Sequence, residues 1–483
     1  MPVVDVPKKF PTDLYLNGEF KPAASGATFD TINPADEEVI APIAKAGAAD
    51  LEAAIAGAEA AQPRWGSAPP AKRASVIWKI GDEIMKRRHE FAALEAMDSG
   101  KPYSECFNID VPMAADHFKY FAGVLRSLEG RTIPVNDNLF VYTLKEPLGI
   151  VAGITPWNFP LLMASRKLAP ALAAGNAVLV KPASPTPLTA LLLGECMTAA
   201  KLPAGLAAIL PGGGREIGQA IVEHPKVAAI SLTGSTPVGV KMIADAAPTL
   251  KKLTMELGGK SPNVIFADAD VDIAVKGAHA AIFYNKGEVC TAGSRLFVEE
   301  SIYDEVVEKL AARAGKMKCG NPLDDACRYG PQNNKAQFET TMSYIEAGKE
   351  EGAKLVAGGE RMAEKGYYVA PTVFADVTPE MRIAKEEIFG PVLAVQKFSE
   401  FDELIEKAND SEFGLAAGVW TRDVSKAHRY AKAIKAGSVW VNCYNWYDSA
   451  VPYGGYKASG YGREMGLGAL DALTQTKSVW VQL

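Results

Sequence analysis

Residues 148–184 read "LGIVAGITPWNFPLLMASRKLAPALAAGNAVLVKPAS", and this stretch decides the fold class. It begins with a short β-branched run and continues with apolar residues at helical spacing up to Gly175. It ends with a second apolar run that stops at Pro182. A strand, a helix and a strand in this order predict a parallel β-α-β unit.

The same alternation continues along the chain. We expect further helices and strands, alternately, at 188–200, 206–210, 216–223, 227–234 and 237–246. A second alternating series begins near residue 261 and runs to about residue 442. Strands rich in Val, Ile, Leu and Ala that are separated by single helices predict two doubly wound α/β domains, each with a parallel sheet covered on both faces.

Two β-branched stretches fit neither series. Residues 130–148 and 474–483 both alternate between apolar and polar side chains. A lone two-stranded ribbon is only marginally stable in water. We therefore expect these stretches to form a small extra sheet that packs on another subunit, in a homodimer or a homotetramer.

The composition is that of a globular protein without a strong charge imbalance. Of the 483 residues, 48% are hydrophobic and 22% are charged, and the net charge is -6. The absence of long runs of like charge argues against nucleic acid as a partner. The N-terminal residues lack the apolar core of a signal peptide, and no apolar run reaches the roughly 18 residues of a membrane span. We therefore expect a cytoplasmic protein with no membrane partner.

The cysteines are scattered, with no CxxC pair and no histidine at a ligand-like spacing. This pattern predicts neither a disulfide framework nor a metal site. Cys290 stands out because it lies in "FYNKGEVCTAGSR" (283–295), between an apolar helix and a glycine-bearing turn. A packing residue, a metal ligand and a nucleophile are all compatible with that position, and packing is the commonest role of a free cysteine.

Neither glycine-rich stretch carries a dinucleotide fingerprint. "PGGGREIG" (211–218) does not match G-x-G-x-x-G, and Val240 stands where a phosphate-binding loop would need lysine. Gly234 nevertheless lies between a strand and a helix, where free backbone N–H groups favour a phosphate. An ordinary helix cap by Ser235 or Thr236 is an equally good interpretation.

A series of motifs relates the chain to a known family. The motifs are "PWNFP" (156–160), "KPASPTP" (181–187), "TGSTPVG" (233–239), "MELGGKSPNVIF" (255–266), "FYNKGEVCTAGSR" (283–295), "EEIFGPV" (386–392) and "PYGGYKASGYGRE" (452–464). In this order and spacing, the chain resembles the NAD(P)-dependent aldehyde dehydrogenase superfamily, of the non-acylating, hydrolytic type, over essentially its whole length.

The resemblance implies an enzyme that oxidises an aldehyde to the carboxylic acid and transfers hydride to NAD(P)+. Cys290 matches the nucleophile that carries first a thiohemiacetal and then a thioester. Asn158 matches the oxyanion donor, assisted by the backbone N–H of Cys290, and Glu256 matches the general base. Without the resemblance, Asn158 would be a turn residue, and Glu256 a half-buried carboxylate whose pKa burial would raise.

The resemblance also implies a set of cofactor contacts. They are Ile154, Thr155, Pro156, Trp157, Lys181, Ser184, Gly214, Gly234, Ser235, Leu257, Glu387 and Phe389. Ser184 departs from the family, because NAD-preferring members often carry glutamate three residues after the lysine. A carboxylate would repel a 2'-phosphate, and serine does not. We therefore expect the enzyme to accept NADP as well as NAD, with Lys181 and Arg215 as phosphate partners.

The substrate tunnel and a proton relay are implied in the same way. The tunnel residues are Phe159, Met163, Arg166, Val289, Thr291, Trp446, Tyr447 and Tyr453. Aromatic walls favour apolar or aromatic aldehydes. Arg166 stands where several members have an aromatic residue, and either binds a carboxylated or polar aldehyde or is solvated at the tunnel mouth. Lys167 and Glu464 match the proposed relay.

The resemblance divides the chain into domains. Residues 1–128 and 149–258 are expected to form the dinucleotide-binding domain, residues 259–458 the catalytic domain, and residues 129–148 and 472–483 the oligomerisation strands.

Three alternative functions are compared with this prediction. A CoA-acylating relative would have little use for Glu256, and a catalytically retired homologue would be expected to lose Cys290, Asn158 or Glu256. A cysteine hydrolase needs an imidazole base, and none of the histidines lies in a supporting motif. His279, on the helix before Cys290, is better interpreted as a packing residue.

Overall fold

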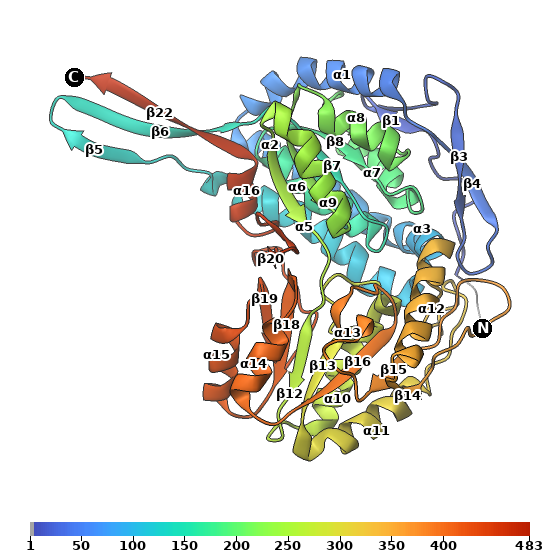
Figure 1. The fold of residues 1–483 in the computed structure, drawn as a ribbon. Coiled ribbons are helices and arrows are strands. Elements are labelled where there is room, and N and C mark those ends of the chain that lie inside the picture. Colours follow the sequence, from blue (N-terminus) through green and yellow to red (C-terminus); the bar gives the residue numbers. More distant parts are fainter. Residues whose placement is uncertain (1–3) are drawn as a thin grey trace.

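Two twisted β-sheets, one in each lobe of the molecule, organise the chain (Figure 1). The structure is a computed structural model and describes residues 4–483. The strand order of the first sheet is β2 (Glu19–Lys21), β1 (Leu14–Leu16), β9 (Ala207–Ile209), β8 (Ala177–Lys181), β7 (Ile150–Ile154), β10 (Val227–Thr233), β11 (Lys252–Glu256) and β21 (Gly460–Tyr461). The strands from β9 to β11 run parallel, whereas β1 and β21 join the two sides of this group antiparallel. The β-α-β unit expected from residues 148–184 lies at the centre of this sheet.

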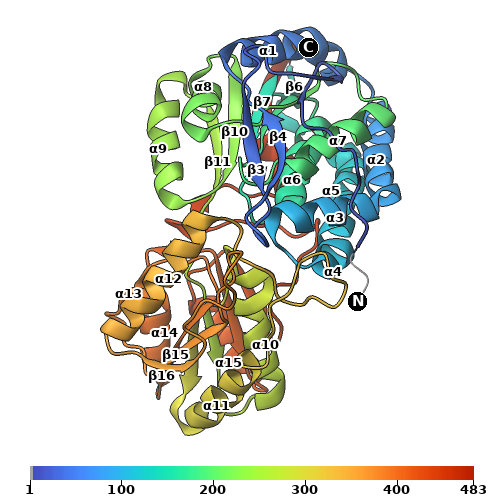
Figure 2. The same cartoon turned by 90° about the vertical axis from the view of Figure 1, so that its right-hand side faces the viewer.

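Helices cover both faces of the first sheet. The helices α6 (Pro160–Ala173) and α7 (Leu188–Ala199) lie on one side, and α8 (Gln219–Glu223) and α9 (Thr236–Ala246) lie on the other (Figure 2). This arrangement follows from right-handed crossovers, because the strand order reverses between β9 and β10. The sequence predicted one helix over 216–223, but a π-helical turn (Gly214–Gly218) precedes α8 there.

Four N-terminal helices complete the upper lobe of Figure 1. They are α1 (Ala48–Gly66), α2 (Pro70–Lys86), α3 (Arg88–Ser99) and α5 (Val111–Val124). Because α5 packs on α6, the helix that follows "PWNFP" is buried along its whole length. This burial fixes the position of the residues at the start of α6.

The second sheet lies in the lower lobe. Its strand order is β14 (Lys354–Ala357), β15 (Thr372–Ala375), β16 (Val392–Phe398), β13 (Arg295–Glu299), β12 (Pro262–Ile265), β18 (Ala416–Trp420) and β19 (Ser438–Val441). All of its pairings except β14–β15 are parallel. The predicted helices are present as α10 (Val271–Phe283), α11 (Tyr303–Ala314), α14 (Phe401–Asn409) and α15 (Val424–Ala433). The strands β14 and β15 and the helix α12 (Lys335–Glu350) were not predicted from the sequence.

A third sheet projects from the upper lobe (Figure 1). In it, β6 (Leu139–Pro147) pairs with both β5 (Thr132–Asn136) and β22 (Thr474–Gln482). Every residue of β5 is exposed. The two α/β sheets and this small sheet together confirm the predicted fold class. Among residues 4–483, no helix combines the length and the apolar character needed to cross a membrane.

Candidate active site

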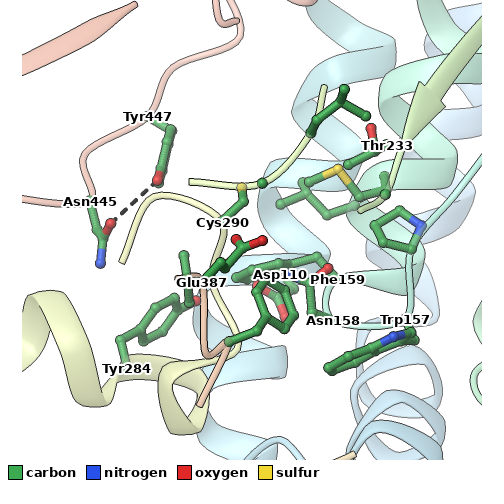
Figure 3. A pocket seen from close by; sticks show the side chains of 18 of the residues that line it. Asp110, Trp157, Asn158, Phe159, Thr233, Tyr284, Cys290, Glu387, Asn445 and Tyr447 are labelled. Atoms are coloured by element: carbon green, nitrogen blue, oxygen red, sulfur yellow. Dashed lines mark hydrogen bonds between the residues drawn. The ribbon is translucent and has the colours of Figure 1, made fainter. Parts of the chain in front are cut away.

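One cavity of about 480 Å³ brings together most of the residues that the motifs single out. Cys290, Asn158, Glu387 and Trp157 are all part of its wall (Figure 3). Its volume lies within the usual range for small-molecule sites, about 300–1,000 Å³. Within residues 4–483, no cluster of three or more His, Cys, Asp or Glu side chains could hold a metal ion.

Cys290 reaches the cavity through a sharp bend after α10. Asn285, Lys286 and Gly287 follow one another in the left-handed region, with φ of 44°, 58° and 77°. A Cβ atom at Gly287 would lie 2.3 Å from the carbonyl oxygen of Gly390. Glycine is therefore required here for both φ and space. Strained backbone of this kind is typical of functional loops.

The Cys290 thiol is protonated in the resting protein. Burial raises the pKa of Cys290 to about 11, and the hydrogen bond with the Tyr453 hydroxyl, 3.2 Å from the sulfur, opposes that rise. Because only the thiolate is strongly nucleophilic, the thiol needs a base or a stabilising partner when it reacts.

Asn158 lies two residues before α6 and is buried. Its side-chain nitrogen donates a hydrogen bond to the carbonyl oxygen of Glu288 at 2.8 Å. An amide nitrogen carries two N–H bonds, so one remains for a ligand in the cavity. The backbone N–H of Cys290 forms no hydrogen bond within residues 4–483. Two donors are therefore available beside the sulfur.

Glu256 ends β11 and is 2% exposed. Neither of its carboxylate oxygens has a hydrogen-bond partner within the described part of the chain. Burial and then the nearby Glu464 carboxylate raise the pKa of Glu256 well above its usual value. An unpartnered buried carboxylate is costly, and such groups are concentrated at functional sites.

Lys167 and Glu464 form a buried ion pair behind Glu256. The Lys167 ammonium also donates to the Ser231 hydroxyl at 2.9 Å and to the Thr233 hydroxyl at 2.6 Å. Burial lowers the pKa of Lys167, and the attraction of Glu464 partly offsets the effect. The pair is linked through hydroxyl groups to the strand β10, which borders the cavity at Thr233.

The N-terminus of α9 also reaches the cavity. Gly234 and Ser235 form part of the wall. Ser235 occupies the cap position, but no side chain caps the helix, and the Thr236 hydroxyl donates to the carbonyl of Ala458 at 3.2 Å. The ordinary helix cap is therefore wrong, and the first N–H groups of α9 can receive an anion.

Glu387 and Phe389 line the opposite wall. The Glu387 carboxylate accepts a hydrogen bond from the backbone N–H of Gly259 at 2.8 Å, and burial raises its pKa to about 7. The Phe389 ring meets the Trp157 ring edge to face, with 5.1 Å between centroids. Both aromatic rings line the cavity.

Lys181 and Ser184 lie outside the cavity. Lys181 ends β8 and is 5% exposed, and burial lowers its pKa to about 8. Its ammonium donates to the carbonyl of Pro182 at 2.9 Å. The Ser184 hydroxyl donates to the carbonyl of Gly212 at 3.0 Å.

Comparison with known proteins identifies the family. The sequence pattern described as "Aldehyde dehydrogenase family" matches residues 20–479. An aldehyde dehydrogenase of Enchytraeus buchholzi is 46% identical over 485 residues, which cover 100% of this chain and 97% of the relative. The chain belongs to the aldehyde dehydrogenase family.

A solved structure and a further relative agree with this assignment. An aldehyde dehydrogenase from Bacillus cereus in complex with NAD+ is 45% identical, with a TM-score of 0.97 over 98% of this chain and 97% of the other. The mitochondrial aldehyde dehydrogenase of Homo sapiens is 45% identical over 99% of this chain and 93% of the relative. The predicted enzyme class is confirmed: the chain is an oxidoreductase that converts aldehydes to acids with a nicotinamide cofactor.

In this aldehyde dehydrogenase, many of the predicted residues share the cavity. Those in its wall are Pro156, Trp157, Asn158, Phe159, Met163, Arg166, Gly234, Ser235, Leu257, Val289, Cys290, Glu387, Phe389, Tyr447 and Tyr453. Those outside it are Ile154, Thr155, Lys167, Lys181, Ser184, Gly214, Glu256, Thr291, Trp446 and Glu464. Thr291 contacts the wall through a 2.6 Å hydrogen bond to Tyr447. Trp446 is 75% exposed, and its tunnel role stays a prediction.

Arg166 corrects one expectation. A solvated arginine at the tunnel mouth was one interpretation, but the residue is 4% exposed. Its guanidinium lies over the Tyr453 ring, 4.9 Å from the centroid. It is buried because α6 is covered by α5 on the side away from the sheet. His279 is a packing residue as expected, with its ring 5.0 Å from that of Phe283.

Several wall residues carry no sequence signal. They include Ile109, Asp110, Met113, Leu162, Gln337 and Asn445. Asn445 accepts a hydrogen bond from the Tyr447 hydroxyl at 3.3 Å (Figure 3). Most of these residues lie on helices outside the motifs, so only the tertiary packing reveals them.

Proposed function

We propose that the enzyme works by covalent catalysis at Cys290, with Asn158 as oxyanion donor and Glu256 as general base. The observation that carries this proposal is the convergence of a thiol, free N–H donors and a buried carboxylate that has no hydrogen-bond partner within residues 4–483. The carboxylate is close enough to act on the pKa of Cys290.

In the first step, the Cys290 thiol would release its proton to solvent, and the thiolate would attack the aldehyde carbon to form a tetrahedral thiohemiacetal. The negative charge develops on the former carbonyl oxygen, which the Asn158 amide and the Cys290 backbone N–H would stabilise. One such donor typically contributes about 2.7–4 kcal/mol to the transition state. The Tyr453 hydroxyl, 3.2 Å from the sulfur, can stabilise the thiolate before attack.

When it is bound, nicotinamide would supply the acceptor for the hydride of the thiohemiacetal carbon. The resulting thioester on Cys290 needs water. Glu256 would take a proton from that water as its oxygen attacks the thioester carbon, and the C–S bond then breaks. The Lys167–Glu464 pair, joined to the Ser231 and Thr233 hydroxyls, would carry the proton away from Glu256.

The cofactor proposal is NAD+, with NADP+ also accepted. The Bacillus cereus relative forms a complex with NAD+. In this chain, the uncapped N-terminus of α9 fits a pyrophosphate. At the expected ribose site, Ser184 stands where NAD-preferring members often carry glutamate, so no carboxylate at this position would repel a 2'-phosphate. Glu216 follows Arg215 in the sequence, but its carboxylate is paired with the Lys45 ammonium at 2.8 Å. Arg215 is exposed and can approach a 2'-phosphate.

For the substrate, we propose an aldehyde that also carries a carboxylate. Arg166 lines the cavity, is buried, and forms no ion pair or side-chain hydrogen bond within residues 4–483. A buried cation normally has an anionic partner. The charge of Arg166 lowers the pKa of the nearby Glu256 and Glu464 carboxylates, but neither forms a direct ion pair with it among the described residues. The substrate carboxylate would supply a direct partner. Arg166→Met should lower kcat/KM for an ω-carboxylated aldehyde at least about 10-fold more than for the uncharged aldehyde of equal length. Equal losses for both aldehydes would contradict the carboxylate site.

For the assembly, we propose a homodimer or homotetramer built on β5, β6 and β22. We propose the same division into domains that the sequence predicts, with residues 129–148 and 472–483 outside the two α/β domains. Trp480 in β22 is 60% exposed, which suits a strand that packs on a second copy of the chain.

The central test measures the acid product and the thiol together. We expect acid formation from an aldehyde and NAD+ without added CoA, and loss of this activity when iodoacetamide modifies Cys290. A Cys443→Ser variant is the matched control, because Cys443 is a partly exposed thiol outside the cavity wall. Full activity of a Cys290→Ala variant would contradict the mechanism, and a strict need for CoA would favour the acylating alternative.

A further inference from the structure

Asn285 lies at the first position of the bend that delivers Cys290. Its side chain is buried, and its backbone is left-handed with φ of 44°. It is not part of the cavity wall, so it does not contact the substrate. Asparagine tolerates this backbone conformation better than most residues, but glycine would tolerate it better still. The side chain therefore needs its own explanation.

The Asn285 amide is hydrogen-bonded to the oxyanion donor. Its nitrogen donates to the backbone carbonyl of Asn158 at 2.9 Å and to the backbone carbonyl of Glu288 at 3.2 Å. The Asn158 amide donates to that same Glu288 carbonyl at 2.8 Å. The backbone N–H of Glu288 in turn donates to the carbonyl of Asn285 at 3.0 Å. These bonds form a closed ring that joins the start of α6 to the Cys290 loop.

The ring constrains which way the Asn158 amide faces. One of its two N–H bonds is used by Glu288, so the planar amide leaves the second N–H in a single orientation. If Asn285 did not hold the Asn158 backbone and the Glu288 carbonyl, the amide could rotate about its side-chain bonds. A donor must be fixed in advance to stabilise an oxyanion, because a mobile donor must be reorganised during the reaction.

Neighbouring bonds hold the loop from its outer side. The Lys286 ammonium pairs with the Glu288 carboxylate at 2.9 Å and donates to the carbonyl of Ser99 at 2.8 Å. The Gln332 amide donates to the carbonyl of Lys286 at 3.0 Å, and the backbone N–H of Asn333 donates to Glu288 at 2.8 Å. The backbone path of the loop therefore does not depend on Asn285 alone. Loss of the Asn285 amide should accordingly have a local effect.

We propose that Asn285 is a positioning residue that orients the Asn158 amide toward the oxyanion formed at Cys290. The proposal rests on the function proposed above, in which Asn158 is the oxyanion donor. It predicts that loss of the Asn285 amide slows only those reactions of Cys290 that pass through an oxyanion.

Two reactions of the same thiol separate this role from a merely structural one. An activated ester acylates Cys290 through a tetrahedral oxyanion: the C–S bond forms, the C–O bond breaks, and the alcohol leaves with the proton from the thiol. Iodoacetamide alkylates the same sulfur by displacement of iodide, without an oxyanion. A displaced or buried thiol would slow both reactions, whereas a misoriented Asn158 slows only the acylation.

The test variant is Asn285→Gly, which keeps the left-handed backbone free of strain and deletes the amide. We expect kcat/KM for the aldehyde and the ester acylation rate to fall by about 10-fold or more, below the 100- to 1,000-fold loss for complete removal of a donor. The alkylation rate and the Kd for NAD+ should change less than about 2-fold. Equal slowing of acylation and alkylation would overturn the proposal.

Asn442→Gly is the matched control. Asn442 is also left-handed, with φ of 55°, and its amide donates to the carbonyl of Thr421 at 2.9 Å, outside the cavity wall. This variant should retain the wild-type kcat/KM, acylation rate, alkylation rate and Kd for NAD+. If Asn285→Gly does not fold, Asn285→Asp repeats the test, because it keeps the shape and the backbone preference and loses the two N–H donors.

A double-variant cycle tests whether Asn285 acts through Asn158. If Asn285 acts through Asn158, Asn285→Gly should lower the acylation rate less than about 2-fold further in an Asn158→Ala background. An undiminished effect in that background would overturn the positioning role and leave the proposed function intact. If Asn158→Ala itself leaves acylation unchanged, the assignment of Asn158 fails and the positioning role falls with it.

Discussion

The sulfur of Cys290 and the hydroxyl of Tyr453 lie 3.2 Å apart, although 163 residues separate them in the chain. The loop after α10 supplies the thiol, and the segment before β21 supplies the hydroxyl. This contact lowers the pKa of Cys290 against the larger, opposite effect of burial. The two residues therefore set the reactivity of the resting enzyme together.

The rate of Cys290 alkylation should rise with pH in the enzyme without cofactor. Because the pKa of Cys290 is raised to about 11, the thiolate fraction increases about 10-fold per pH unit from about pH 7 to pH 10. Tyr453→Phe removes a bond that lowers this pKa, so its profile should move to higher pH. Tyr447→Phe is the control, because the Tyr447 hydroxyl bonds to Thr291 at 2.6 Å. Rates of inactivation by iodoacetamide test this, and a flat wild-type profile would contradict it.

Glu256→Gln should separate hydride transfer from hydrolysis. Because the amide cannot accept a proton from water, the thioester should accumulate, and one rapid turnover should precede a steady state slower by about 100- to 10,000-fold. In the wild type, the raised pKa of Glu256 means that hydrolysis speeds up as pH rises. Pre-steady-state measurement of reduced cofactor, with mass analysis of the protein, tests this. A variant that turns over normally would exclude Glu256 as the base.

Glu464→Gln should change both stability and pH dependence. It leaves the buried Lys167 ammonium without its carboxylate, which typically costs about 3–5 kcal/mol in the free energy of unfolding. It also removes repulsion that raises the pKa of Glu256, so the rise in activity should begin at lower pH. The control Glu216→Gln breaks an exposed pair with Lys45 and should cost less than about 1 kcal/mol. Denaturant unfolding and pH–rate profiles measure both effects, and equal stability losses would contradict the prediction.

Ser184→Glu should abolish the use of NADP+ while NAD+ is retained. A carboxylate at this position repels a 2'-phosphate, and each 1.4 kcal/mol of repulsion lowers kcat/KM about 10-fold. In the wild type, the pKa of Lys181 is about 8, so this lysine loses its charge as pH rises through that value. The kcat/KM ratio of NADP+ to NAD+ should therefore fall above about pH 8. A wild type that never reduces NADP+ would contradict the assignment.

The sequence predicts the central fold well because hydrophobic periodicity reports directly on buried strands. The strand β18 and the helix α7 lie close to their expected positions. The antiparallel pair β14 and β15 was not predicted, because short strands with an irregular register carry little hydrophobic periodicity. The π-helical turn at Gly214–Gly218 has no periodic signal at all.

The candidate site is also only partly predictable from the sequence. Motifs single out Cys290, Asn158 and Glu256 as residue types with suitable chemistry. Only the structure reveals that Arg166 is buried and has no ion pair among the described residues, since a local pattern cannot show what covers a helix. The role of Asn285 is equally hidden, because its bond to Asn158 joins positions 127 residues apart.

The pairing of β11 with β21 has a consequence for the order in which the enzyme matures. Glu256 ends β11, and its neighbouring strand comes from Gly460–Tyr461, just before Glu464. On the ribosome, the strand that carries the base is made long before the strand that flanks it. A nascent chain that has already produced Cys290 still lacks Tyr453 and Glu464. The set of residues that surrounds the reactive thiol and the base is therefore complete only after synthesis has passed residue 464.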